Sequence, residues 1–172
     1  RLDTLYNKFR KKDKVFDPPI STFEPTKKEA NVPNINTIPG EDVLYFDCRV
    51  LPYYKLADVL KAVKLMVKET EKKYKVQIKM EHPQMESAAP PTTADAPVVL
   101  AIARAMKELR KMKTRPMGIG GGTVAKYFRD AGLPCAVWAT MDEVAHTADE
   151  YALLPAMIAD AKVFAHIAMQ DD

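Results

Sequence analysis

Residues 43–51 read Val-Leu-Tyr-Phe-Asp-Cys-Arg-Val-Leu, and this stretch decides how the first half of the chain folds. Leu44, Phe46 and Cys48 alternate with a second set of positions that holds the charged side chains. That period of two predicts a β-strand buried chiefly on one side. A helical pattern follows from about Leu56 to Tyr74, with apolar residues three and four apart and lysines on the opposite face. We therefore expect this helix to pack on the sheet that holds the strand.

The segments around this pair extend the same unit. Residues 2–9 predict a short helix that stops before Pro18 and Pro19, because a residue before proline disfavours helical geometry. Residues 20–30 are expected to be extended, and the alternation from Val76 to Glu81 predicts another half-buried strand. Helices and strands are thus mixed in the first half of the chain.

A domain boundary is predicted in the stretch from Ser87 to Asp95, which is rich in proline and small residues. It separates a lysine-rich first half from an alanine-rich second half. Beyond it, Asp95 is a candidate N-cap for a helix that ends near Lys111. A second helix is expected from Thr123 to Ala131, with Gly132 as a left-handed cap.

The rest of the second half favours an alternating α/β arrangement. Residues 135–140 read Cys-Ala-Val-Trp-Ala-Thr without alternation, which is typical of a strand covered on both faces in a parallel sheet. A last helix is expected from about Leu153 to Ala168, with one apolar stripe. Strand and helix patterns that alternate in this way indicate an α/β domain.

Composition restricts the class of protein. The 172 residues are 47% hydrophobic and 28% charged, as in a globular protein, and the formal net charge is +3. No sustained basic tract predicts a nucleic-acid or anionic-membrane surface, and no apolar run approaches the roughly 20 residues of a membrane span. Cys48 and Cys135 lack metal or disulfide spacing, so we expect reduced, buried thiols and a cytoplasmic location.

The glycine run Gly118-Ile-Gly-Gly-Gly-Thr123 precedes a predicted helix and could present backbone N–H groups to an anion or an oxyanion. A dinucleotide fingerprint would need a glycine where Thr123 stands, and a phosphate loop would need a Gly-Lys pair that is absent. Both nucleotide interpretations are therefore rejected. A tight turn between a strand and a helix remains an equally acceptable explanation of the run.

His146 lies between a predicted buried strand and a predicted helix, where α/β sheets present the ends of their strands to ligands. Ligand status and an ordinary packed or solvated histidine both remain open for it. His82 ends a predicted surface strand, and His166 lies on a helix without a partner at ligand spacing. These two histidines are interpreted as structural.

Two residues of the first half are candidates for substrate contact. Arg49 has a planar fork of donors that suits a carboxylate, although a surface ion pair with Asp47 or Glu41 explains it equally well. Asn36 precedes the turn that leads into the strand at 43–51, and a turn-stabilising role is the alternative.

Five motifs together resemble the C-terminal two-thirds of the zinc-dependent acetylornithine deacetylase and succinyl-diaminopimelate desuccinylase family. The resemblance covers about residues 31–172 and is specific because all five occur in the family's order and spacing. The motifs are Asn34-Ile-Asn-Thr-Ile-Pro-Gly-Glu41, Asp47-Cys-Arg-Val-Leu-Pro52, Gly120-Gly-Gly-Thr123, Phe128-Arg-Asp-Ala-Gly-Leu-Pro134 and Ala145-His-Thr-Ala-Asp-Glu-Tyr151.

The resemblance implies an α/β fold with an α+β lid. Residues 1–88 would form a ferredoxin-like lid or dimerisation domain, and residues 89–172 the C-terminal portion of an α/β zinc-hydrolase catalytic domain. It also implies a homodimer through the lid, for which the segments 20–30 and 76–82 are the candidate edges. The implied substrates are small N-acyl amino acids or short peptides.

The resemblance also implies individual roles. His146 matches a histidine that ligates one of two zinc ions, and the substrate-binding positions match Asn36, Arg49, Gly122 and Thr123, with Arg49 on a carboxylate. Val124 departs from the pattern, because many members have Asp or Ser after Gly-Gly-Thr, which leaves the contribution of that loop to substrate choice open.

The family's other metal ligands come from a His-x-Asp motif, a Glu-Glu pair that includes the general base, and a further acidic residue. Neither the His-x-Asp motif nor the Glu-Glu pair occurs in these 172 residues. We therefore expect an inactive fragment that lacks the N-terminal catalytic half and binds zinc weakly. A metallo-carboxypeptidase or dipeptidase with the same chemistry is the alternative within the family, and a non-catalytic dimerisation or binding module is the alternative outside it.

Overall fold

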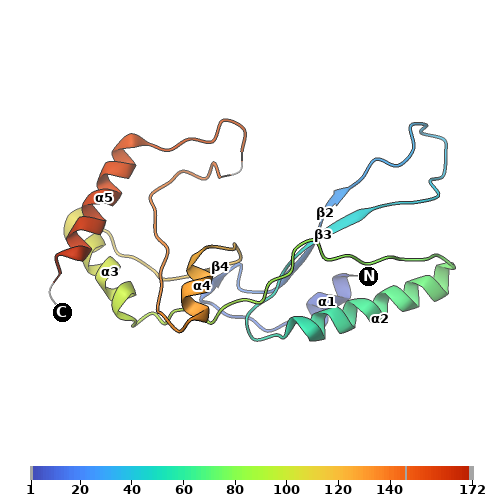
Figure 1. Cartoon of the computed structure of the whole chain (residues 1–172), viewed down its shortest axis with the longest axis horizontal. Coiled ribbons are helices and arrows are strands. Elements are labelled where there is room, and N and C mark those ends of the chain that lie inside the picture. The colour runs from blue at the N-terminus through green and yellow to red at the C-terminus, as the bar shows by residue number, and fades with distance from the viewer. Residues whose placement is uncertain (1, 146, 171–172) are drawn as a thin grey trace. The chain divides into compact units, whose positions relative to one another are not determined.

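The computed structural model describes residues 2–145 and 147–170, in which helices and small sheets are mixed as predicted (Figure 1). The chain divides into two compact units. The first comprises Arg1–Ala88 with Gly118–Gly121, and the second comprises Ala89–Met117 with Gly122–Asp172. The division after Ala88 lies within the proline-rich stretch, whereas the return of Gly118–Gly121 to the first unit was not expected. The identification of the first unit as a lid stays a prediction.

The first unit contains α1 (Asp3–Lys8), β1 (Phe16–Asp17), β2 (Thr22–Lys28), β3 (Leu44–Arg49), α2 (Leu56–Tyr74) and β4 (Gly118–Ile119). The predicted helices at the N-terminus and at 56–74 are therefore confirmed, as are the strand predicted within 43–51 and the extended segment predicted at 20–30. β2 and β3 form an antiparallel hairpin in which Thr22 lies opposite Arg49 and Lys28 lies opposite Leu44. β1 and β4 form a second, parallel pair.

The core of the first unit lies between α1, β2 and α2. Leu5 of α1 is fully buried and Phe23 of β2 is 2% exposed, and both contact Val59 and its neighbours on α2 through one cluster. Phe9 extends this cluster, because its ring lies 6.0 Å from the ring of Phe23 and 5.0 Å from that of Tyr54. The helix thus packs on the strands as its apolar stripe predicted.

Two expectations for the first unit are wrong. β3 is exposed along both faces rather than buried on one, because the hairpin has only two strands and α2 reaches Phe23 of β2 instead. The segment from Val76 to Glu81 forms no strand, and Val76 is 47% exposed. Alternation marks which side of a strand suits burial, but a strand also needs a hydrogen-bonded neighbour, and the segment has none among the described residues.

The second unit contains α3 (Pro97–Arg110), α4 (Ala125–Asp130) and α5 (Leu154–Ala168), close to the predicted bounds. α3 and α5 lie side by side (Figure 1) and share a small core in which Ala105 and Val163 are fully buried. Trp138 joins this core, and its ring lies 5.7 Å from that of Phe164. Gly132 has φ of +79°, so the left-handed end of α4 is confirmed.

Two further expectations fail in this unit. Asp95 does not cap α3, since the capping position is Ala96, and the Asp95 carboxylate accepts a hydrogen bond from Thr93 that lowers its pKa. Residues 135–140 run extended without pairing as a strand, and Val137 is 61% exposed. A strand covered on both faces needs strands on both sides, and none lies beside it in the described part of the chain.

Candidate functional site

Arg49 lies at the end of β3, where two hydrogen bonds and an ion-pair contact hold its guanidinium. Its Nε and Nη2 atoms each lie 2.7 Å from Oδ2 of Asp47. Its Nη1 atom donates to the carbonyl oxygen of Gly120 at 2.6 Å. The ion pair with Asp47 was one of the two explanations that the sequence left open, and the contact with Gly120 adds a second anchor from a distant part of the chain.

The glycine run reaches Arg49 because β4 pairs with β1. Gly118 lies opposite Phe16, and a Cβ atom at Gly118 would lie 2.5 Å from the Phe16 ring. Gly120 lies against the aliphatic stem of Arg49, with its Cβ position 3.5 Å from Cγ of Arg49. Close packing therefore accounts for Gly118, and at Gly120 the run presents a carbonyl oxygen to a cation rather than an N–H group to an anion.

Gly122 and Thr123 follow this run and belong to the second unit. A Cβ atom at Gly122 would meet no atom within 4 Å, so packing against described residues does not require a glycine there. The carbonyl oxygen of Thr123 accepts a hydrogen bond from the Lys126 amide at 3.0 Å, at the start of α4. The substrate-binding role of both residues stays a prediction.

Asn36 lies in the long loop of residues 29–43 between β2 and β3, which projects beyond the ends of both strands (Figure 1). Its side chain is exposed in a turn, as the alternative interpretation expected. The structure does not bring Asn36 and Arg49 together: the loop joins β3 at Leu44, and Arg49 is at the other end of the strand. At about 3.3 Å per residue these ends are roughly 17 Å apart.

The base of this loop is held by Asp42. Its carboxylate lies 2.9 Å from Nζ of Lys28 and accepts a hydrogen bond from Nδ2 of Asn31 at 3.0 Å. Hydrogen bonding to Lys28 lowers the pKa of Asp42, because the lysine favours the ionised carboxylate. The anchors fix where the loop begins and ends, whereas Ile35 and Ile38 near its tip are fully exposed.

His146, the predicted metal ligand, lies outside the described residues. The segment that leads to it is tied down at both ends. The hydroxyl oxygen of Thr92 donates to the carbonyl of Cys135 at 2.7 Å and accepts from its amide at 3.1 Å. Thr140 donates from its amide and its hydroxyl to the two carboxylate oxygens of Asp160, each at 2.7 Å. Sequence reasoning missed this network.

No three histidine, cysteine, aspartate or glutamate side chains come together as a metal site within the part of the chain that the structure describes. His82 is exposed, and Nε2 of His166 lies 2.7 Å from a carboxylate oxygen of Glu108, in keeping with their structural interpretation. Cys48 and Cys135 are free thiols, but Cys48 is exposed and Cys135 partly so, which corrects the expectation that both are buried. The described residues therefore do not fit a metal centre by themselves.

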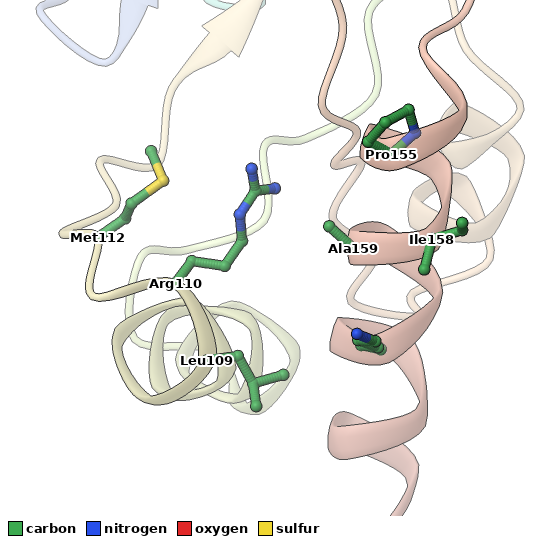
Figure 2. A pocket seen from close by; sticks show the side chains of 7 residues that line it. Leu109, Arg110, Met112, Pro155, Ile158 and Ala159 are labelled. Atoms are coloured by element: carbon green, nitrogen blue, oxygen red, sulfur yellow. The ribbon is translucent and has the colours of Figure 1, made fainter.

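A groove of about 600 Å³ lies where the end of α3 faces α5 (Figure 2). Its lining includes Leu109, Arg110 and Met112 on one side and Pro155, Ile158 and Ala159 on the other. Lys162 also lines the groove, and none of the lining residues is a serine, cysteine, histidine or acidic residue. It is a surface of the α3–α5 pair.

None of the described helices combines the length and the apolar character that a membrane crossing requires.

Comparison with known proteins defines the class. Residues 6–170 match the model of peptidase family M20/M25/M40, so the chain belongs to that family. Two curated relatives, both named as uncharacterized metallohydrolases, are similar to it. The protein from Methanococcus maripaludis is 36% identical over 178 residues, and the one from Methanocaldococcus jannaschii is 35% identical over 171 residues.

The alignments cover 96% and 95% of this chain but 43% and 42% of the two relatives. The chain thus spans about two fifths of the length of the curated relatives that it matches. Membership of the broad family agrees with the resemblance seen in the sequence, whereas the acetylornithine deacetylase and succinyl-diaminopimelate desuccinylase subfamily is a finer assignment.

Proposed function

We propose that the whole protein is a zinc-dependent amidohydrolase that removes an N-acyl group from an amino acid such as succinyl-diaminopimelate or acetylornithine. In this proposal the present chain supplies the group that binds the substrate carboxylate. The family match, the metallohydrolase names of both relatives and the five motifs support the reaction class. The observation that carries the substrate class is the arrangement of Arg49.

An arginine has five N–H donors in a fixed plane. Among the described residues, Arg49 donates from Nε to Asp47 and from Nη1 to Gly120, and its Nη2 atom makes an ion-pair contact with Asp47. At least one donor therefore remains on each terminal nitrogen. Two such donors match the two oxygens of a carboxylate, and the arginine side chain is 49% exposed, so a small anion can reach it.

The other site residues have subordinate roles in this proposal. His146 serves as one ligand of the zinc centre. The remaining ligands belong to the family's His-x-Asp and Glu-Glu motifs, which do not occur in these 172 residues. Gly122 and Thr123 keep the substrate-binding role that the family resemblance implies for them. In a homodimer, the Asn36 that approaches a given Arg49 belongs to the second copy, because the two lie at opposite ends of one hairpin.

Replacing Arg49 by alanine in the whole protein is expected to raise KM for a substrate with a free carboxylate by roughly 30-fold. A hydrogen-bonded contact between charged groups is worth about 2 kcal/mol, which corresponds to that factor. For the same substrate with its carboxylate converted to a carboxamide, KM should change little in Arg49→Ala. Steady-state kinetics on the two substrates measures the difference.

Arg104 is the matched control, because it is an exposed arginine on α3 and its replacement removes the same charge. Arg104→Ala should leave KM unchanged for both substrates. Equal losses on the carboxylate and the carboxamide in Arg49→Ala would contradict the proposed carboxylate contact.

A metallo-carboxypeptidase or dipeptidase is the second candidate, and the family description favours it because it names peptidases. Both candidates use a free carboxylate next to the bond that is cleaved, so Arg49 has the same role in each. Relative kcat/KM for an N-acetyl amino acid and for a dipeptide with the same C-terminal residue separates them.

The proposal includes a cytoplasmic homodimer. The free thiols agree with a reducing compartment. The segment 76–82 forms no strand, and β2 carries Pro25 and an irregular register between Pro25 and Lys27, features that oppose edge pairing. The outer edge of β3 is therefore the better candidate for symmetric pairing.

Light scattering of the whole protein is expected to give twice its sequence mass across a wide range of concentration. The physical reason is that paired strand edges satisfy backbone groups that a monomer leaves to solvent. A monomeric mass at high protein concentration would reject the dimer and with it the assignment of Asn36 to the neighbouring copy.

A further inference from the structure

Asp47 contacts Arg49 more closely than an ordinary surface ion pair requires. One oxygen, Oδ2, accepts a hydrogen bond from Nε at 2.7 Å and lies 2.7 Å from Nη2. The two residues are two positions apart on β3, so their side chains leave the same face of the hairpin. Phe23 and its partner Cys48 occupy the alternate positions, and Phe23 points into the core. The pair therefore lies on the face turned away from the core cluster.

The position of Asp47 has an electrostatic cost. In the register of the hairpin it lies directly opposite Glu24, and like charges across an antiparallel pair are destabilising. Glu24 accepts a hydrogen bond from the Tyr6 hydroxyl, which raises the pKa of Tyr6, so this acid has its own partner on α1. Arg49 is the cation that offsets the charge of Asp47. Asp47 therefore costs the hairpin stability through Glu24, and its contact is with Arg49.

Asp47 and Gly120 hold the guanidinium from different sides. Asp47 takes the Nε edge, Gly120 takes one donor of Nη1, and the stem of Arg49 lies against the backbone of Gly120. An exposed ion pair alone orders a long side chain weakly. Two hydrogen bonds and an ion-pair contact, from two elements, leave few rotamers in which the remaining donors could point elsewhere.

Resting on the carboxylate contact proposed above, we propose that Asp47 is a positioning residue, which holds Arg49 so that one free donor on each terminal nitrogen faces the substrate carboxylate. Ordering this side chain before binding removes an entropic cost from the binding step. Asp47 also places a negative charge near the anion, so two opposite effects compete. The geometry favours orientation as the larger, because both short contacts are made with the donors that the substrate does not need.

The test uses Asp47→Ala and Asp47→Asn in the whole protein, with the carboxylate substrate and its carboxamide counterpart. Asp47→Ala removes both the acceptor and the charge and is expected to raise KM for the carboxylate about tenfold, with kcat and the carboxamide nearly unchanged. Asp47→Asn keeps an acceptor oxygen for Nε and should raise this KM clearly less. Asp58→Ala is the matched control, because it removes the same charge from an exposed aspartate in the first turn of α2.

A second readout needs no substrate. The Nε–H resonance of Arg49, assigned by its loss in Arg49→Ala, should be sharp in the wild type and in Asp58→Ala, and broadened by rotamer exchange in Asp47→Ala. This measurement stands even if the carboxylate contact fails, in which case Arg49→Ala would show no preference between the two substrates.

A lower KM for the carboxylate in Asp47→Ala would mean that Asp47 competes with the substrate, and it would overturn the proposal. Equal changes on the carboxylate and the carboxamide, or a fall in kcat, would assign Asp47 to structure alone and overturn it as well. Circular dichroism checks that each variant folds, and Asp47→Asn keeps the kinetic comparison available if Asp47→Ala does not.

Discussion

Replacement of His146 by alanine in the whole protein is expected to lower kcat/KM by more than about 100-fold. Residues that merely orient a metal ligand cost about 10- to 100-fold when changed, so the loss of a ligand should cost more. The motif Ala145-His-Thr-Ala-Asp-Glu-Tyr151 is the basis for this role. Steady-state kinetics measures the effect, and elemental analysis of the purified variant should show less bound zinc than in the wild type.

The chain offers two controls of the same residue type. His82 is exposed in an extended segment, and His166 pairs with Glu108 on the α3–α5 surface. Alanine at either position should leave kcat/KM within about twofold, because surface substitutions away from a site have small effects. Full zinc content together with full activity in His146→Ala would show that this histidine is not a ligand.

Replacement of Leu5 by alanine is expected to destabilise the first unit by about 3 kcal/mol, within the range for a fully buried leucine. Leu5 is 0% exposed and lies in the cluster with Phe9, Phe23 and Val59. Hydrogen exchange of the amides of α2 reports the free energy of unfolding of this unit separately from the second one. Those amides should exchange faster by roughly two orders of magnitude.

Leu65 is the matched control, because it is a leucine of α2 that is 51% exposed. Leu65→Ala makes the same chemical change, and its effect should stay within about 0.5 kcal/mol. Similar losses of unfolding free energy in Leu5→Ala and Leu65→Ala would show that the cluster around Leu5 is not the core of the unit.

The helices could be predicted because their signals are local. The lysines and apolar residues from Leu56 to Tyr74 define α2 to the residue, and Gly132 marks the end of α4. Residues 76–81 and 135–140 were predicted as strands because their patterns suit strands. A strand forms only beside a partner, and the identity of a partner is not written in the segment itself.

In the candidate site, too, contacts between near neighbours in the sequence could be predicted, whereas contacts between distant residues could not. Asp47 was foreseen as a partner of Arg49 because the two are neighbours on one strand. The contact with Gly120 was not, since 71 residues separate it from Arg49. Asp160, which holds Thr140 and lies 3.4 Å from Arg110, had one usable signal: it is a lone acid in the apolar run of α5. Such an acid on a buried stripe needs a partner.

The close approach of Gly118 to Phe16 has a consequence for anyone who surveys variants of this protein. An added methyl group would lie 2.5 Å from the aromatic ring, so the ring or the β1–β4 pair must move to admit it. Two residues further on, the carbonyl of Gly120 holds Arg49. A change at position 118 would therefore disturb the anchor of Arg49, and under the proposed function it would imitate the loss of the carboxylate contact. A loss of activity on substitution of Gly118 would therefore reflect its packing against Phe16 and not a direct role in binding.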